Sequence, residues 1–266
     1  MFDLFTYGFV LKAVLGGILI AIACSLIGVF LVLKRLSLFG DGLAHVAFGG
    51  VAIGFLLGID PFVSALVFTS LGALSVGKIL EKAKIYGDSA TALVLSVGMS
   101  IAILIIGVSK GFNVNLFSFL FGSILTLSNL DLMIIFGICF VVVSYVIFNF
   151  KNLLLYAFSP DQIMVGSKVK SVTFVLSLLT AFVVVISMRA VGILLVSALI
   201  VIPSLTALSI SRSFKSALVL SVVFGIISVL FGIIVSVVFD LPSGAVIVLS
   251  SFLIFIILSI LKSFGK

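Results

Sequence analysis

Gly8–Leu33 reads GFVLKAVLGGILIAIACSLIGVFLVL, an apolar stretch that contains a single charged residue, Lys12. About 20 apolar residues in a helix span the hydrocarbon core of a bilayer, which is about 30 Å thick. The apolar part of a signal peptide has only about 7–15 residues, so this stretch is too long to be one. We therefore predict that the chain begins with a retained transmembrane helix.

The rest of the chain has the same character. Of its 266 residues, 64% are hydrophobic and 9% are charged, and the mean hydropathy is +1.59. A soluble domain carries about 25% charged residues, so this chain lacks the polar surface that water requires. We predict an all-α fold in which residues 1–266 form a single polytopic transmembrane helical bundle, with residues 112–128 as one short re-entrant segment. About nine spans are expected, at residues 8–33, 40–58, 61–79, 90–109, 131–150, 172–188, 190–210, 216–239 and 243–261.

The basic residues predict the orientation of these spans, because Lys and Arg collect in the cytoplasmic loops of membrane proteins. With the N-terminus outside and nine crossings, twelve of the 15 basic residues fall on the cytoplasmic side, together with the C-terminus. Only Lys12, Lys110 and Arg189 fall on or near the outer side. The net charge of +7 thus reflects membrane topology, and no basic block is dense enough to bind nucleic acid.

Residues 39–45 read FGDGLAH and contain the only histidine of the chain, His45, four residues after Asp41. Residues i and i+4 of a helix share one face, so a carboxylate oxygen and an imidazole nitrogen can bind the same divalent metal ion. An ionisable residue inside a span is costly and is a functional candidate by default. The structural alternative is that Asp41 caps its helix or pairs with Lys34 or Arg35, and that His45 is an interior residue. The spacing alone leaves both interpretations open.

Pro203 lies in the middle of the span at residues 190–210, and Thr206 follows three residues later. Proline removes a helix hydrogen bond and kinks the helix, which frees a carbonyl oxygen. One interpretation is that this carbonyl and the Thr206 hydroxyl line a polar substrate pathway. A passive kink explains the sequence equally well.

The longest inner loop, residues 151–171, contains Pro160, Asp161 and Gly166. We expect a short helix here that is capped next to Pro160 and ends at Gly166. Such a helix is a suitable docking element for a cytosolic partner, and an ordinary basic loop is the alternative. The chain has no G-x-x-x-x-G-K-[ST] phosphate loop, so any ATP must be hydrolysed by another chain.

Blocks in several parts of the chain form a specific combination: LKRLSLFGDGLAH at 33–45, GVA at 50–52, LFGSIL at 120–125, SPD at 159–161, VGILL through IP at 191–203 and DLPSG at 240–244. With these blocks the chain resembles, over nearly its whole length, the permease subunits of bacterial and archaeal ABC importers for zinc and manganese. It is most similar to the zinc-type permeases, because residues 48–50 read FGG where manganese and iron members often have Pro-Gly.

The resemblance implies a transport subunit in the plasma membrane of a prokaryote, without an ATPase site of its own. Its partners would be a second permease copy, a cytosolic ABC ATPase and an extracytoplasmic metal-binding protein. No cofactor would be bound permanently, since the divalent metal is cargo and the partner hydrolyses ATP. Asp41 and His45 would lie on the metal path, and the loop with Pro160, Asp161 and Gly166 would dock on the ATPase, although it departs from the D-x-x-x-A-x-x-x-G spacing of many members.

Two other functions fit part of the sequence. A gradient-driven secondary metal transporter or channel usually places several charged residues within its spans, whereas Asp41 and His45 are nearly alone here. A membrane scaffold without a substrate is the third hypothesis, and reconstituted transport would exclude it.

Overall fold

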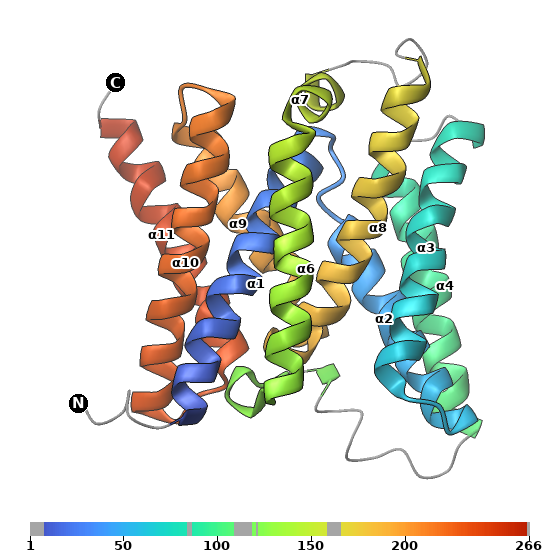
Figure 1. The fold of residues 1–266 in the computed structure, drawn as a ribbon. Coiled ribbons are helices and arrows are strands. Elements are labelled where there is room, and N and C mark those ends of the chain that lie inside the picture. Colours follow the sequence, from blue (N-terminus) through green and yellow to red (C-terminus); the bar gives the residue numbers. More distant parts are fainter. Residues whose placement is uncertain (1–7, 84–86, 109–118, 121, 159–165, 265–266) are drawn as a thin grey trace.

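The computed structural model describes residues 8–83, 87–108, 119–120, 122–158 and 166–264, and all regular structure in this part of the chain is helical (Figure 1). The long helices run side by side, which confirms the predicted all-α transmembrane bundle. The α-helices of the described residues are α1 (Gly8–Leu33), α2 (Phe39–Leu57), α3 (Pro61–Ala83), α4 (Gly87–Val108), α6 (Asn129–Phe148), α7 (Phe150–Phe158), α8 (Gly166–Val191), α9 (Ile193–Ile210), α10 (Phe214–Phe239) and α11 (Ser243–Phe264).

Eight of the described helices are long and apolar enough to cross a membrane. They coincide with eight of the predicted spans, and the ninth corresponds to α9, whose apolar stretch Leu195–Ile210 is shorter. Figure 1 shows α1 beginning at one end of the bundle and α11 ending at the other, as an odd number of crossings requires. We call these the N-terminal end and the C-terminal end. Which end faces the cytoplasm stays a prediction from the basic residues.

The predicted re-entrant segment is described only in part, because residues 112–118 and 121 lie outside the described residues. Its remainder contains the short 3-10 helix η2 (Ile124–Thr126). Helix α4 ends and α6 begins at the same N-terminal end of the bundle, so the chain returns to the side that it left (Figure 1). The segment therefore adds no net crossing.

The turn between α2 and α3 shows how local sequence sets the helix bounds. Gly58 adopts φ 67° and ends α2, a left-handed conformation that glycine takes without steric cost. The Asp60 carboxylate accepts hydrogen bonds from the backbone N–H groups of Phe62 and Val63, at 2.9 and 3.0 Å. Pro61 is the first residue of α3, where its missing N–H costs nothing.

Helix α7 was not predicted, because all of it except Phe150 lies within residues 151–171, which we assigned to an inner loop. It has nine residues, too few for a span, and its buried side chains are Leu153, Tyr156 and Ala157. Figure 1 shows it nearly end-on beyond α6, so it lies across the C-terminal end of the bundle. The expectation that Gly166 ends a short helix is not met either, since Gly166 is the first described residue of α8.

The break between α8 and α9 lies at Gly192, whereas the sequence suggested a break at Arg189. Gly192 has φ 92° and ψ 153°, a backbone conformation that is essentially restricted to glycine. The helix continues through Arg189 because the charge of that residue is paired with a carboxylate, as described below. A charged residue alone is thus a weaker helix-end signal than glycine here.

Helix α2 lies close to its neighbours because small residues line its contacts. A Cβ atom added at Gly50 would lie 2.7 Å from the Ala65 Cα of α3, and one added at Gly49 would lie 2.9 Å from the Gly98 carbonyl oxygen of α4. Both distances are shorter than real Cβ contacts, so the backbones approach as closely as small-residue helix packing allows. This packing fixes the helix that carries Asp41 and His45.

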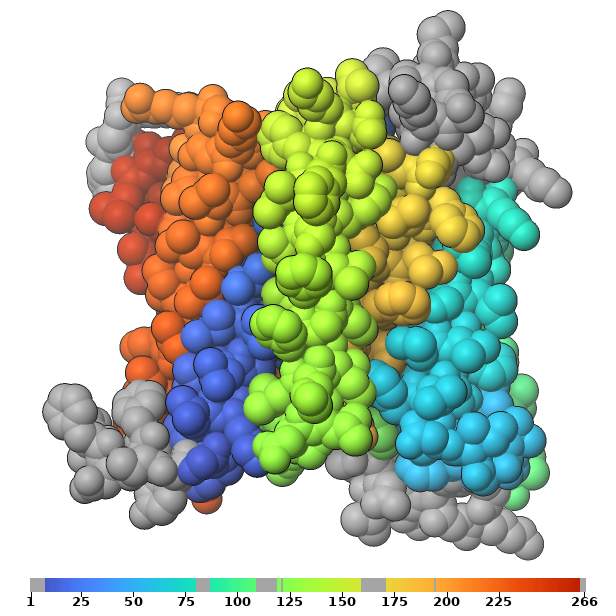
Figure 2. Space-filling view, viewed as in Figure 1, coloured from blue at the N-terminus to red at the C-terminus, as the bar shows by residue number. Residues whose placement is uncertain are grey.

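Helix α6 presents an apolar ridge on the surface of the bundle. It runs over the full height of the molecule in the space-filling view (Figure 2). Its outward side chains include Met133, Phe136, Phe140 and Phe148, all well exposed. Exposed apolar surface on this scale is suited to lipid and not to water.

Helix α1 ends in a Schellman-type turn whose left-handed residue is Arg35 instead of glycine. Arg35 has φ 56°, its N–H donates to the Val32 carbonyl at 3.1 Å, and the Leu36 N–H donates to the Leu31 carbonyl at 2.9 Å. A residue with a Cβ atom pays about 1–2 kcal/mol for this conformation. The Arg35 side chain is exposed, so its replacement does not disturb the core.

We therefore expect Arg35→Gly to raise the free energy of unfolding by about 0.5–1 kcal/mol, because glycine relieves the steric cost of the turn. Thermal unfolding of the detergent-solubilised protein measures this, with an expected rise of about 2 °C in Tm. Arg35→Ala removes the same charge but keeps the Cβ atom, so it is the control and should give no gain. An equal gain in both variants would contradict the backbone explanation.

Candidate functional site

Asp41 and His45 lie one turn apart on α2, as the sequence predicted. The distance from His45 Nε2 to Asp41 Oδ1 is 3.8 Å, and the two side chains are 17% and 30% exposed, respectively. Leu38 occupies the N-cap position, so Asp41 stands in the first turn of the helix and is not its capping residue. A carboxylate in the first turn is still favoured by the helix dipole.

The geometry of this pair suits a divalent cation. At 3.8 Å, Nε2 and Oδ1 are too far apart for a hydrogen bond. Two such ligands at about 2.1 Å from a tetrahedral metal lie about 3.4 Å apart, which a small side-chain rotation achieves here. The second ring nitrogen of His45, Nδ1, is buried without a hydrogen-bond partner. The ring thus has its Nδ1 edge buried, and its Nε2 atom lies 3.8 Å from the carboxylate.

A single copy of the chain supplies only part of a metal site. Among the described residues, no group of three or more His, Cys, Asp and Glu side chains comes together. The glycines on either side of Asp41 pack against neighbouring helices, Gly40 against Ile200 and Ser197 of α9 and Gly42 against Thr91 of α4. Further ligands must come from water, from backbone and hydroxyl oxygen atoms, or from another chain.

Pro203 and Thr206 are both buried within α9. The Thr206 hydroxyl donates to the Ile202 carbonyl at 2.7 Å, and so binds its own helix one turn back. In this conformation both residues contribute to helix structure and packing. Their place on a substrate pathway stays a prediction.

The predicted docking residues fall at the edge of what the structure describes. Pro160 and Asp161 lie outside the described residues, and Gly166 begins α8. Helix α7 precedes this segment directly and lies at the C-terminal end of the bundle (Figure 1).

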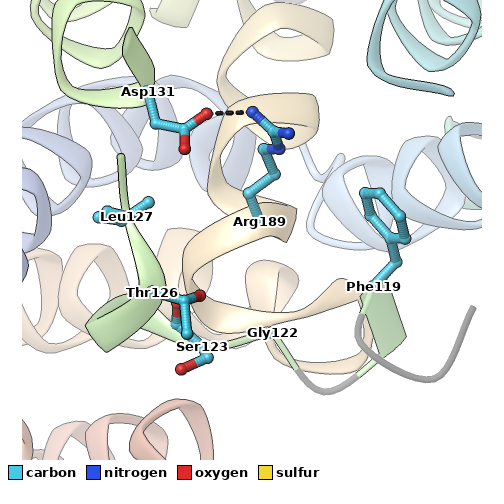
Figure 3. Close-up of a pocket in the computed structure, with 7 residues that line it drawn as sticks. All are labelled: Phe119, Gly122, Ser123, Thr126, Leu127, Asp131 and Arg189. Atoms are coloured by element: carbon cyan, nitrogen blue, oxygen red, sulfur yellow. Dashed lines mark hydrogen bonds and ion pairs between the residues drawn. The ribbon is translucent and has the colours of Figure 1, made fainter. Parts of the chain in front are cut away.

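A pocket of about 280 Å³ lies away from the Asp41–His45 pair, where α6 begins and α8 ends. Its polar feature is an ion pair between Arg189 of α8 and Asp131 of α6 (Figure 3). The Arg189 guanidinium also lies 5.1 Å from the ring centroid of Phe62, so it joins α6, α8 and α3. The residues that line the pocket are Phe119, Gly122, Ser123, Thr126, Leu127, Asp131 and Arg189.

Sequence reasoning missed this ion pair, although a signal was present. Arg189 was one of three basic residues on the side where the positive-inside rule disfavours them, and such a charge near a membrane needs a partner. Asp131 is also held locally, because its carboxylate accepts a hydrogen bond from the Ser128 N–H at 3.0 Å in a capping box. The separation of 58 positions between Asp131 and Arg189 in the sequence hid the pairing.

Three of the sequence blocks meet beside this pocket. A Cβ atom added at Gly122 would lie 2.2 Å from the Gly192 backbone nitrogen, and one added at Gly244 would lie 2.3 Å from the Val191 carbonyl oxygen. The Ile124 N–H donates to the Ser243 hydroxyl at 3.4 Å. The blocks around residues 122, 192 and 244 therefore form one close-packed junction.

Known proteins match this chain over nearly its full length. A family profile described as the ABC 3 transport family matches residues 6–262. The chain is 33% identical to the manganese transport system membrane protein MntC of Halalkalibacterium halodurans, over 93% of this chain and 85% of MntC. It is 29% identical to the high-affinity zinc uptake system membrane protein ZnuB of Haemophilus influenzae, over 92% and 94% of the two chains.

A solved structure agrees with these sequence matches. PsaBC from Streptococcus pneumoniae in complex with Fab superposes with a TM-score of 0.82 and 31% identity, covering 95% of this chain and 91% of that chain. The resemblance that the sequence blocks indicated is thus confirmed in both sequence and fold. From its membrane-spanning helices, the junction of its sequence blocks and these matches, we conclude that the chain belongs to the ABC 3 transport family.

Proposed function

We propose that this chain is the membrane-spanning permease subunit of an ATP-driven importer for a divalent transition metal. The observation that carries the proposal is the Asp41–His45 pair, a carboxylate and an imidazole that lie 3.8 Å apart on one face of a transmembrane helix. The names of the relatives support it, since MntC is a manganese protein and ZnuB a zinc protein. On this proposal the pair binds the metal transiently while it crosses the membrane.

The incomplete site supports a homodimer. Asp41 and His45 are partly exposed in a single copy, and polar groups within a span are costly unless protein or water covers them. A second copy that covers this face of α2 would bring an equivalent pair. Together the two copies offer four ligands, two carboxylates and two imidazoles, which is the number that tetrahedral Zn²⁺ takes.

We favour Zn²⁺ over Mn²⁺ as cargo. Nitrogen and oxygen ligands bind both ions, but a site of given ligands binds Zn²⁺ more tightly in the usual order of divalent metals. The FGG sequence at residues 48–50 supports the same choice. The relatives named above include both metals.

An ATPase and a metal-binding protein complete the proposed importer. Its sequence has no phosphate loop, so we assign ATP hydrolysis to a cytosolic ABC ATPase that docks at the segment with Pro160, Asp161 and Gly166. An extracytoplasmic metal-binding protein would deliver the metal at the opposite, N-terminal end. The protein then lies in the plasma membrane of a prokaryote with the N-terminus outside and the C-terminus in the cytoplasm.

The test is uptake of radiolabelled metal by proteoliposomes that contain the permease with its ATPase and binding protein. We expect Zn²⁺ to accumulate only when ATP and the ATPase are both present, and unlabelled Mn²⁺ to compete less well than unlabelled Zn²⁺. Uptake that persists without the ATPase would contradict the proposal and favour a gradient-driven transporter. Stronger competition by Mn²⁺ would overturn the choice of metal alone.

A further inference from the structure

Helix α7 links the proposed docking segment to the transmembrane bundle. The chain passes directly from α7 into residues 159–165, and α7 lies across the C-terminal end of the bundle (Figure 1). Two rings of α7, Phe150 and Phe158, each lie 5.7 Å from the ring of Phe214 at the start of α10. Force applied to the docking segment therefore acts directly on α7, as it does on α8 at the other end of the segment.

Tyr156 is the largest of the buried side chains of α7. It is only 2% exposed, and its hydroxyl is hydrogen-bonded to Thr173 of α8. The Lys34 ammonium lies over the Tyr156 ring, 4.7 Å from the ring centroid. Burial raises the pKa of Tyr156 to about 12, so the phenol is neutral at physiological pH and the contact with Lys34 is a cation–π interaction.

Lys34 belongs to the short connection that leads into the metal-site helix. The N–H of Lys34 donates to the Phe30 carbonyl at 3.1 Å, and the N–H of Phe39 donates to the Leu36 carbonyl at 3.0 Å. Leu36 is 8% exposed and is pressed against Gly87 of α4. Only four residues separate Lys34 from Phe39, the first residue of α2, and hydrogen bonds and packing hold this short connection in place.

We propose that the contact between Lys34 and Tyr156 transmits the ATP-driven movement of α7 to the start of α2, where Asp41 lies. Lys34 and Tyr156 are positioning residues in this scheme, because neither touches the metal. The inference rests on the proposed function. It adds a mechanical route from the docking segment to the metal site, through one side-chain contact between residues 122 positions apart.

The experiment measures metal ions taken up per ATP hydrolysed by the reconstituted permease–ATPase–binding-protein complex. Tyr156→Leu removes the ring and Lys34→Met removes the cation, and each is expected to lower this ratio about five-fold while ATP hydrolysis continues. Tyr156→Phe and Lys34→Arg preserve the cation–π contact and should keep the wild-type ratio. A merely structural role would lower uptake and hydrolysis in parallel and leave the ratio unchanged.

Lys215→Met is the matched control, because Lys215 also lies over an aromatic ring of α7, 5.7 Å from the Phe150 centroid, but stands on α10. This variant should keep the wild-type ratio. An unchanged ratio in Lys34→Met, in a wild-type background that imports metal with ATP, overturns the coupling inference alone. If buried Tyr156 does not tolerate Leu, Lys34→Met on a half-buried side chain carries the test. A wild-type complex without ATP-driven uptake overturns the proposed function and this inference with it.

Discussion

Substitution of His45 by Gln or of Asp41 by Asn is expected to lower ATP-dependent metal uptake by at least about 100-fold. Even residues that only support a metal ligand change affinity by about 10–100-fold, so loss of a ligand from a weak site should cost more. Both substitutions keep the size of the side chain, which preserves the packing of α2 between α3 and α4. The measurement is radiolabelled Zn²⁺ uptake by proteoliposomes with the ATPase and binding protein present.

The same pair predicts a dependence of uptake on pH. Metal binding requires a neutral imidazole and an ionised carboxylate, so protons compete with the metal and uptake should fall as the pH is lowered.

The matched control for the Asp41 and His45 substitutions is Asp60→Asn, which changes an acid in the exposed turn before α3 and can keep its cap hydrogen bonds. It should transport at the wild-type rate. Wild-type uptake by both the Asp41 and the His45 variants would exclude the pair from the metal path.

Much of the fold was predictable because transmembrane helices are specified locally. Composition decides that a segment enters lipid, and residues such as Gly58, Asp60 and Pro61 mark helix ends through interactions within a few positions. The spacing of Asp41 and His45 is likewise a local property, so the sequence placed them on one helical face. These features need no knowledge of how the helices pack.

The features that the sequence did not predict depend on contacts between distant segments. Arg189 was taken as a helix break because its partner, Asp131, comes from another helix. Helix α7 was taken as loop because nine residues carry too weak a pattern, and its place becomes clear only from the burial of Tyr156 under Lys34. The contacts proposed with a second copy and with an ATPase also join residues that are not neighbours in the sequence. A single sequence therefore carries little signal for them.

One added methyl group in the junction beside the Asp131–Arg189 pocket should cause a large loss of stability. Gly122 adopts φ 61°, and a Cβ atom there would lie 2.2 Å from the Gly192 nitrogen and 2.6 Å from the Val191 carbonyl carbon. These neighbours are backbone atoms, which cannot rotate away as a side chain does. Gly192 cannot move aside freely, because its own backbone conformation ends α8 and begins α9.

Gly122→Ala is therefore expected to lower the free energy of unfolding by about 3 kcal/mol or more, from about 1–2 kcal/mol of left-handed strain and about 1–3 kcal/mol of overpacking. In detergent this should appear as a fall of about 10 °C in Tm. Gly137→Ala is the matched control, because Gly137 is exposed on α6 with no atom within 4 Å of an added Cβ. Alanine favours a helix interior over glycine by about 1 kcal/mol, so this variant should be as stable as the wild type or more so. Equal melting of both variants would mean that the backbones of residues 122 and 192 separate without cost, and that the junction does not hold α8, α9 and the pocket together.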